Sequence, residues 1–277
     1  MVLFAAFSLS ARLTGGYEAR YSPQAVHLAS YLNFGRVVGN PTRRGICFIV
    51  GAERFEDYNQ DLCLHQEKGK ENYLLLGDSH AASLWPGLSS DLAGVNIMQA
   101  TAANCDPFIQ PEGPAACTKL MRFIYRDYLP AHPVQGLLLH LRWELSDLGG
   151  MKETVDWAKE RNIPIIIFGP SPEYDAPLPR LEAYAVTLKE PNLLSEHLVA
   201  TTAPLDAKMA ALAQSTWHVP YVSLYRALCD NEGCTAFADA AHTIPLLADS
   251  NHFSTEGSVM VVQRVIDRGE LHLPAGR

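Results

Sequence analysis

The order of apolar runs along this chain constrains its fold more than any other feature. Five runs have the length of β-strands and are apolar almost throughout, at residues 73–76, 95–99, 136–141, 163–168 and 221–224. Such runs are typical of parallel strands that helices cover on both faces. Because helix-like stretches separate them, we predict an α/β fold with three α/β/α layers and a central, mostly parallel five-stranded sheet.

The stretches between these runs predict the helices. We expect them near residues 81–92, 118–129, 151–160 and 204–217, with a last one from residue 255 to about residue 268. The proline-rich residues 171–191 follow the fourth apolar run. An excursion at the carboxyl end of a strand is where α/β folds place substrate loops, and we predict that role here. The main domain is assigned to residues 70–277.

The N-terminal part divides into two segments. Residues 1–21 open with an apolar run over residues 1–8, which is too short for a bilayer span of about 20 residues. It fits a buried terminal segment, a linker or the end of a membrane helix, and the arginines and tyrosines that follow it favour the membrane helix. Residues 22–69 show no clear period, so we expect a disulfide-tied extension or a linker there.

The balance of acidic and basic residues limits the kinds of partner that this chain can bind. The chain has 277 residues, enough for a large core, and 30 acidic against 22 basic residues give a formal charge of −8. Affinity for nucleic acids comes largely from Lys and Arg side chains that neutralise phosphates. We therefore predict no nucleic-acid partner.

The six cysteines fall into three pairs of sequence neighbours: Cys47 with Cys63, Cys105 with Cys117, and Cys229 with Cys234. An even number at short spacing favours local disulfides in an oxidising compartment. Buried reduced thiols are the alternative, and sequence alone leaves the connectivity open. Because no C-x-x-C pair or H-E-x-x-H helix presents ligands at metal spacing, we predict no metal site.

Ser79 lies directly after the first apolar run, in the segment Gly77-Asp-Ser-His80, and before a predicted helix. A strand-to-helix turn presents the serine hydroxyl beside unpaired helix N–H groups, which stabilise an oxyanion. The simpler interpretation is that this segment only caps the helix. Taken alone, the segment is compatible with both interpretations.

A second polar segment, Asp249-Ser-Asn-His252, precedes the last predicted helix. A serine becomes a nucleophile when a base takes its proton and a carboxylate orients that base. Asp249 and His252 supply these two groups from one turn. With Ser79 at a strand end, they predict a Ser-His-Asp triad.

These two segments resemble the first and last motif blocks of SGNH (GDSL-like) hydrolases. The resemblance narrows to the SGNH domain fused to acyltransferase-3 membrane proteins on four further features, which are residues 74–88, residues 99–107, Arg142-Trp143 and the Cys229 to Cys234 loop. It covers roughly residues 45–270.

The resemblance implies an SGNH hydrolase or flavodoxin-like fold and an O-acyltransferase, with acetyl as the expected group. The acceptor would be a bacterial cell-surface polysaccharide such as lipopolysaccharide O-antigen, peptidoglycan or exopolysaccharide, acylated through an acyl-Ser79 intermediate. No bound cofactor is implied. A fused or separate acyltransferase-3 membrane domain would supply the acyl group, ultimately from acetyl-CoA, at the periplasmic face of the inner membrane.

The remaining site residues also come from the resemblance. The family pattern has a glycine in its second block and an asparagine in its third, where this chain has Asn104 and Arg142. We expect both, with the backbone N–H of Ser79, to form the oxyanion hole. From the residues themselves, His80 and Trp143 are possible contacts for the acceptor, and packing in the core is the alternative for both.

Two other functions use the same sequence features. An esterase or deacetylase would employ the same triad with water as the acceptor, on carbohydrate or lipid esters. A non-catalytic glycan-binding module would keep the fold alone, although the complete set of Ser79, Asp249 and His252 favours an enzyme.

Overall fold

The computed structural model describes residues 16–33, 39–90, 92, 94–190 and 192–273. A six-stranded sheet with the strand order β1-β3-β2-β4-β5-β6 lies at its centre, and each neighbouring pair is parallel. The strands are β1 (Phe48–Ile49), β2 (Glu71–Gly77), β3 (Val95–Ala102), β4 (Gly136–His140), β5 (Ile165–Phe168) and β6 (Tyr221–Val222). A separate antiparallel hairpin joins β7 (Cys229–Asp230) and β8 (Gly233–Cys234).

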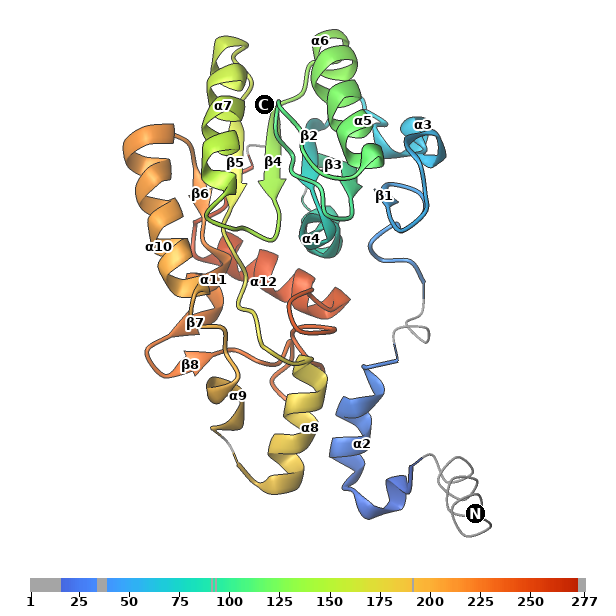
Figure 1. Ribbon diagram of the computed structural model, residues 1–277, viewed down its shortest axis with the longest axis vertical. Helices are drawn as coiled ribbons and strands as arrows, with labels where there is room; N and C mark the ends of the chain where they lie inside the picture. Colours follow the sequence, from blue (N-terminus) through green and yellow to red (C-terminus); the bar gives the residue numbers. More distant parts are fainter. Residues whose placement is uncertain (1–15, 34–38, 91, 93, 191, 274–277) are drawn as a thin grey trace.

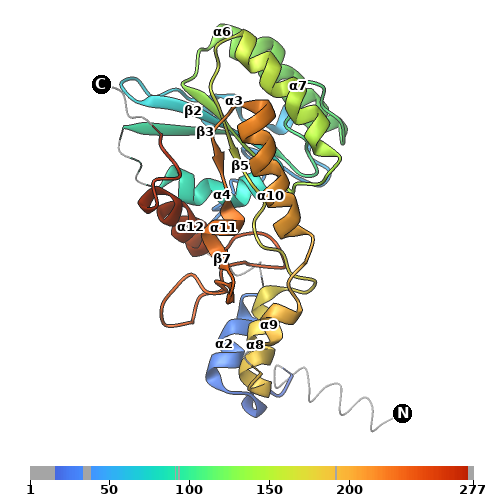
Figure 2. The same ribbon diagram turned by 90° about the vertical axis from the view of Figure 1, so that its left-hand side faces the viewer.

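Helices cover both faces of the sheet (Figures 1 and 2). The α-helices are α2 (Pro23–Ser30), α3 (Gln60–Cys63), α4 (Ser79–Ser89), α5 (Ala115–Phe123), α6 (Leu129–Ala131), α7 (Asp147–Glu160), α8 (Leu178–Leu188), α9 (Leu193–Glu196), α10 (Thr202–Leu212), α11 (Leu224–Leu228) and α12 (Thr255–Asp267). Helices α5 and α10 continue into the π-helical turns η4 (Ile124–Tyr128) and η5 (Ala213–Trp217), and the short 3-10 helices are η1 (Glu18–Arg20) and η3 (Phe55–Asp57).

The alternation of strand side chains builds two cores. On β2, Leu74 and Leu76 belong to the core under α5, α7 and α10, whereas Tyr73 and Leu75 belong to the core under α4, α11 and α12. Successive strand residues point to opposite faces, so a strand that is apolar at every position is buried on both. The predicted three-layer α/β/α architecture is therefore confirmed.

The prediction of five strands was wrong by one. The sixth strand, β1, lies at the sheet edge, where Phe48 pairs with Thr101 of β3. A strand of two residues is too short to show a period, so the sequence pattern of residues 22–69 contained no sign of it. Part of the N-terminal extension is thereby an element of the main sheet.

Two helices lie in segments that were expected to be irregular. Helix α2 packs side by side with α8, away from the sheet (Figures 1 and 2), around Ala25, Leu28 and Ala183. Prolines occupy the first turns of both helices. The first N–H groups of a helix have no intrahelical partner, so proline, which lacks an N–H, is tolerated there. The proline-rich residues 171–191 can therefore contain the helix α8.

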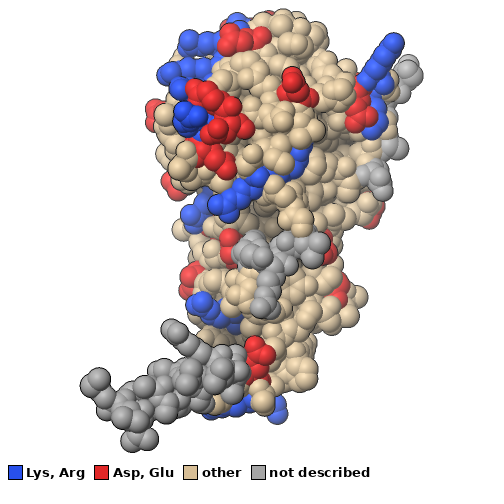
Figure 3. Space-filling model, turned by 90° about the vertical axis from the view of Figure 1, so that its right-hand side faces the viewer, with Lys and Arg blue, Asp and Glu red and all other residues tan. Residues whose placement is uncertain are grey.

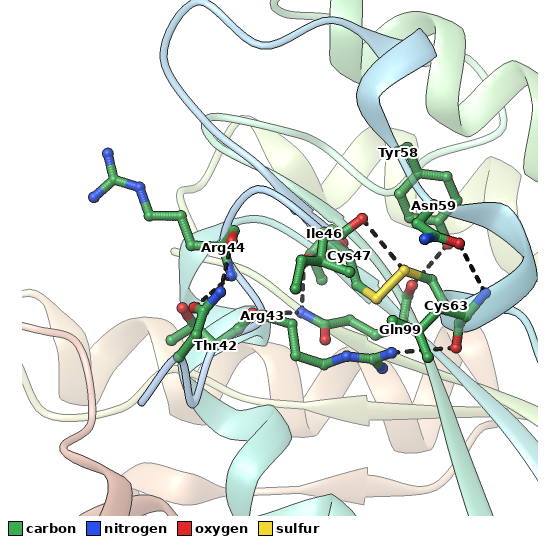
Figure 4. The surroundings of a disulfide bond; sticks show 12 residues. Thr42, Arg43, Arg44, Ile46, Cys47, Tyr58, Asn59, Cys63 and Gln99 are labelled. Carbon is green, nitrogen blue, oxygen red and sulfur yellow. Dashed lines mark hydrogen bonds between the residues drawn. A yellow bond between two sulfur atoms is a disulfide. The ribbon is translucent and has the colours of Figure 1, made fainter. Parts of the chain in front are cut away.

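Three disulfides join Cys47 to Cys63, Cys105 to Cys117 and Cys229 to Cys234, the sequence-neighbour pairing that the cysteine spacing favours. Figure 4 shows the surroundings of the first. The Tyr58 hydroxyl donates to the Gln99 carbonyl on β3 at 2.8 Å, and the Gln99 amide donates to the Thr42 carbonyl at 3.1 Å. The disulfide therefore closes a loop within the extension, and hydrogen bonds to Gln99 attach the extension to β3.

Charge is mixed on the face shown in Figure 3, where Lys and Arg side chains lie among Asp and Glu side chains. Of the helices in the described ranges, none combines the length and apolar character that a bilayer span requires. The prediction for residues 1–8 lies outside the described residues.

Candidate active site

Ser79 is held at a sharp turn between β2 and α4. The strand ends at Gly77, where φ is +150° and a β-carbon would come within 1.7 Å of the His140 carbonyl oxygen. Glycine is therefore required where β2 passes β4. Asp78 then caps α4, its carboxylate accepting from the His80 N–H at 2.8 Å, and Ser79 becomes the first residue of the helix.

Ser79, His252 and Asp249 form a continuous hydrogen-bonded chain. The Ser79 Oγ lies 2.7 Å from His252 Nε2, and His252 Nδ1 lies 2.8 Å from Asp249 Oδ2. The second carboxylate oxygen of Asp249 accepts from the backbone N–H groups of Asn251 and His252 at 2.9 and 2.8 Å. The arrangement can move a proton from Ser79 to His252 while Asp249 holds the ring.

The excursion after β5 holds the Asp249 to His252 loop in place. The Tyr174 N–H donates to the Ser250 carbonyl, and the Leu178 N–H donates to the Asp249 carbonyl, each at 2.9 Å. The proline-rich pattern drew attention to this segment as a substrate loop, whereas these bonds make it a support for the loop that carries Asp249 and His252. Backbone donors leave no signal in a sequence, so this role was missed.

The charges around His252 favour its protonated form. Burial lowers the pKa of His252, but the hydrogen bond and negative charge of Asp249, with the charge of Asp78, outweigh it and raise this pKa above its usual 6.5. Burial likewise raises the pKa of Asp249, yet the bond to His252 lowers it overall. When His252 takes the proton of Ser79 and becomes an imidazolium, the ionised Asp249 carboxylate therefore stabilises it.

Asp78 connects the serine turn to the end of β4. Its second carboxylate oxygen accepts from the Arg142 backbone N–H at 3.1 Å. Burial raises the pKa of Asp78 to about 6, although the hydrogen bonds from Arg142 and His80 act in the opposite direction. The sequence pattern suggested no role for the Asp78 segment beyond capping the helix; the link of Asp78 to β4 follows from the parallel pairing of Gly77 with His140.

The two further candidates for the oxyanion hole lie at neighbouring strand ends. Asn104 follows β3, is exposed and has a left-handed backbone with φ +52°. Arg142 follows β4, but its guanidinium donates from Nε and Nη2 to the carboxylate of Glu173, at 3.1 and 2.8 Å. Their roles as oxyanion donors stay predictions, and in Arg142 the charged group faces Glu173.

The structure corrects the expectation that His80 and Trp143 contact the acceptor. The His80 side chain is 2% exposed, and the Trp143 side chain is 4% exposed with its indole N–H donating to the Phe168 carbonyl at 2.7 Å. Both rings are core residues behind the site, because the start of α4 and the end of β4 turn them inward. Neither presents a face to a sugar.

A serine at the end of β2, bonded to a histidine that lies three residues after its aspartate in the loop before the last helix, is the arrangement of SGNH, or GDSL-like, domains. The sequence profile of the family described as "SGNH domain (fused to AT3 domains)" matches residues 47–267. The chain therefore belongs to this family. A search of curated protein sequences finds no significant match.

Several solved structures are similar to this chain, and the first of those named here has the same fold. The periplasmic domain of the lipopolysaccharide acetyltransferase of Salmonella ser. Paratyphi A has a TM-score of 0.71 and 21% identity, over 87% of this chain and 96% of that chain. The catalytic domain of peptidoglycan O-acetyltransferase A of Streptococcus pneumoniae has a TM-score of 0.40 and 14% identity, over 72% and 92%. A GDSL-like lipase of Bacteroides thetaiotaomicron has a TM-score of 0.49 and 11% identity, over 78% and 96%.

Proposed function

We propose that this chain is an O-acyltransferase domain that transfers an acyl group, acetyl by expectation, to a hydroxyl of a bacterial cell-surface polysaccharide. The observation that carries the proposal is the hydrogen-bonded chain from Ser79 through His252 to Asp249 in a domain of a family fused to AT3 domains. A half-buried triad of this kind supports acyl transfer through a covalent serine intermediate.

In the first half of the reaction, His252 Nε2 takes the proton of Ser79 while the serine Oγ attacks the carbonyl carbon of the acyl donor. The tetrahedral intermediate collapses, its bond to the donor oxygen breaks, and His252 returns the proton to that oxygen. Acyl-Ser79 remains. In the second half, a sugar hydroxyl loses its proton to His252 while its oxygen attacks the acyl carbon. The bond from that carbon to Ser79 Oγ then breaks, His252 returns the proton to Oγ, and the acylated sugar leaves.

Two groups stabilise the charges that develop. Asp249 keeps His252 in the tautomer with its free lone pair on Nε2 and stabilises the imidazolium. The backbone N–H of Ser79, at the first position of α4, is free of intrahelical bonding and is the first oxyanion donor in the proposal. Asn104 and Arg142 are the further candidates; Arg142 would have to leave Glu173 to use its guanidinium.

The partner follows from the family. An AT3 membrane domain, fused or separate, would deliver the acyl group from acetyl-CoA, and the SGNH domain would act at the periplasmic face of the inner membrane. Three disulfides suit that oxidising compartment. Lipopolysaccharide O-antigen, peptidoglycan and exopolysaccharide are the acceptor classes to test.

The first experiment supplies 4-nitrophenyl acetate with and without oligosaccharides of these three classes, and mass spectrometry follows the sugars. We expect an acetylated sugar with the unaltered chain and a loss of turnover on the order of 10³-fold or more in Ser79→Ala. Ser89→Ala, an exposed serine at the far end of α4, is the matched control and keeps full activity.

The alternatives have distinct outcomes. Release of acetate without acetylated sugar for every acceptor would replace the transferase by an esterase. Equal turnover in Ser79→Ala and the unaltered chain would remove the nucleophile assignment. Binding of an oligosaccharide without any turnover would favour a glycan-binding module.

A further inference from the structure

His80 lies directly behind the base of the candidate site. Its ring centroid is 4.8 Å from that of His252, with the ring planes inclined by 53°. The ring of His140 lies 6.0 Å from that of His80, with the ring planes inclined by 67°. The sequence puts His80 next to Ser79, but the first turn of α4 sends its side chain into the interior and against the imidazole of His252.

The hydrogen bonds of His252 leave one motion of its ring unopposed. Nδ1 is bound to Asp249 and Nε2 to Ser79, so both bonds lie near the plane of the ring. Two in-plane bonds hold the two nitrogens but resist tilting of the ring out of that plane only weakly. The backbone of His252 is held by its N–H, which donates to Asp249, and by its carbonyl, which accepts from the Ala248 N–H, so a group packed against the ring itself would oppose the remaining tilt.

The ring of His80 supplies that contact. Its Nε2 is buried and has no hydrogen-bond partner among the described residues, so this nitrogen does not bond to His252 and the two rings pack against each other. The backbone of His80 is fixed independently, because its N–H donates to Asp78 at 2.8 Å and its carbonyl accepts from the Ser83 hydroxyl at 2.9 Å. His80 is therefore a ring of fixed position against the imidazole of His252.

His80 also stays uncharged while His252 gains a proton. Burial lowers the pKa of His80 well below its usual value, and the neighbouring His252, His140 and Arg142 lower it further. The pKa of His140 is about 4 for the same main reason, burial. At neutral pH, the imidazolium of His252 thus meets a neutral ring, and the charges that face it are Asp249, Asp78 and Arg142.

We propose that His80 is a positioning residue for the acyl-transfer reaction, whose ring fixes the tilt of the His252 imidazole and keeps water from its inner face. This inference rests on the proposed function of the triad. His80 acts through His252 and makes no contact with acceptor or donor, since its side chain is buried.

The test compares His80→Ala, which removes the ring, with His80→Phe, which keeps a ring and removes both nitrogens. We expect His80→Ala to lower kcat for 4-nitrophenyl acetate on the order of 10- to 100-fold with KM unchanged, because a misplaced base slows the chemical step alone. Water that enters beside His252 stabilises its charged form, so its pKa and the acidic limb of the pH profile move to higher pH. His80→Phe restores most of kcat and the original limb.

A measurement that does not need turnover separates this proposal from the proposed function. The ¹⁵N shifts of His252 are titrated by NMR in the unaltered chain and in each variant. His140→Phe is the matched control, since the ring of His140 packs against His80 and, among the ring contacts of the described residues, makes none with His252. The expected result is a shifted titration in His80→Ala alone. If His80→Ala fails to fold, His80→Phe against His80→Asn makes the same comparison, and Asn is expected to behave as Ala.

Three results would overturn the proposal. The first is an unchanged His252 titration in His80→Ala. The second is a loss of kcat in His80→Phe as large as in His80→Ala, which would assign the effect to a ring nitrogen. The third is an equal shift in His140→Phe, which would make the effect a general one of the core. If the unaltered chain shows no turnover, the proposed function is wrong. The titration of His252 in the His80 variants then tests the positioning role of His80 by itself.

Discussion

At the scale of single residues, the site depends on what surrounds His252. Asp249 bonds Nδ1, Ser79 bonds Nε2, and the ring of His80 packs against the imidazole. Only the neutral imidazole accepts the serine proton, so the pKa of His252 sets the lower pH limit of the proposed activity. Because that pKa is raised above 6.5, the rate should climb as pH rises through neutrality.

Asp249→Asn tests this dependence. The amide keeps the shape but removes the charge that raises the pKa of His252, so the midpoint of the acidic limb of kcat/KM should move to lower pH. The rate on the plateau should fall by about 10⁴-fold, because the amide favours the wrong tautomer of His252. Hydrolysis of 4-nitrophenyl acetate from pH 5 to 9 measures both. Asp267→Asn, at the far end of α12, is the control. If the midpoint of the acidic limb were unchanged in Asp249→Asn, the charge of Asp249 would not be what raises the pKa of His252.

At the scale of elements, the packing of α2 on α8 encloses an unusual carboxyl group. Glu182 of α8 is 1% exposed, and neither of its carboxyl oxygens has a hydrogen-bond partner among the described residues. Burial raises the pKa of Glu182 to about 9, and the nearby charge of Asp239 adds to this. The carboxyl is therefore protonated in the folded state at neutral pH.

Glu182 should make the stability of the chain fall as pH rises. In the unfolded chain this group ionises near pH 4.5, and in the folded chain near pH 9, so between these values the folded state holds the extra proton. The free energy of unfolding then decreases by up to about 1.4 kcal/mol per pH unit in that window. In Glu182→Gln, melting curves from pH 5 to 9 should show a weaker dependence. Glu190→Gln, an exposed control, should follow the unaltered chain; identical slopes for all three would exclude this role of Glu182.

At the scale of the whole molecule, the N-terminal extension and the main domain form one structure. β1 completes the sheet edge, and Cys47 and Cys63 are buried in the same core as the helices on that face. The Cys229 to Cys234 bond differs, because it closes a short hairpin and its cysteines are half-buried.

The two disulfides should therefore contribute unequally to stability. Their sequence separations are 16 and 5 residues, and a longer closed loop restricts the unfolded chain more. We expect Cys47→Ser with Cys63→Ser to cost about 3 kcal/mol plus the loss of buried packing, and Cys229→Ser with Cys234→Ser about 2 kcal/mol. Urea unfolding of both double variants measures the difference. A larger cost for the hairpin pair would contradict this view of the extension.

Patterns that are local in the sequence predicted most of the sheet. The runs that form β2 to β5 are apolar at nearly every position because both of their faces are buried, so neighbouring residues alone reveal them. The two motif segments likewise carried Ser79, Asp249 and His252, since each chemical group lies at a turn that its own neighbours form. The pairing of Phe48 with Thr101 joins residues that are far apart in the sequence and leaves no local pattern. For this reason the strand β1 was not predicted.

By itself, the sequence determined the layer architecture and the three residues of the candidate triad, because burial and turn chemistry leave local signatures. Only the tertiary structure decided which groups surround them. Ser79 and His252 are 173 residues apart, and the ring that covers His252 belongs to His80, which sequence reasoning had turned toward the acceptor. The direction of a side chain at a helix start depends on how that helix packs against the sheet, and that is a property of the whole fold.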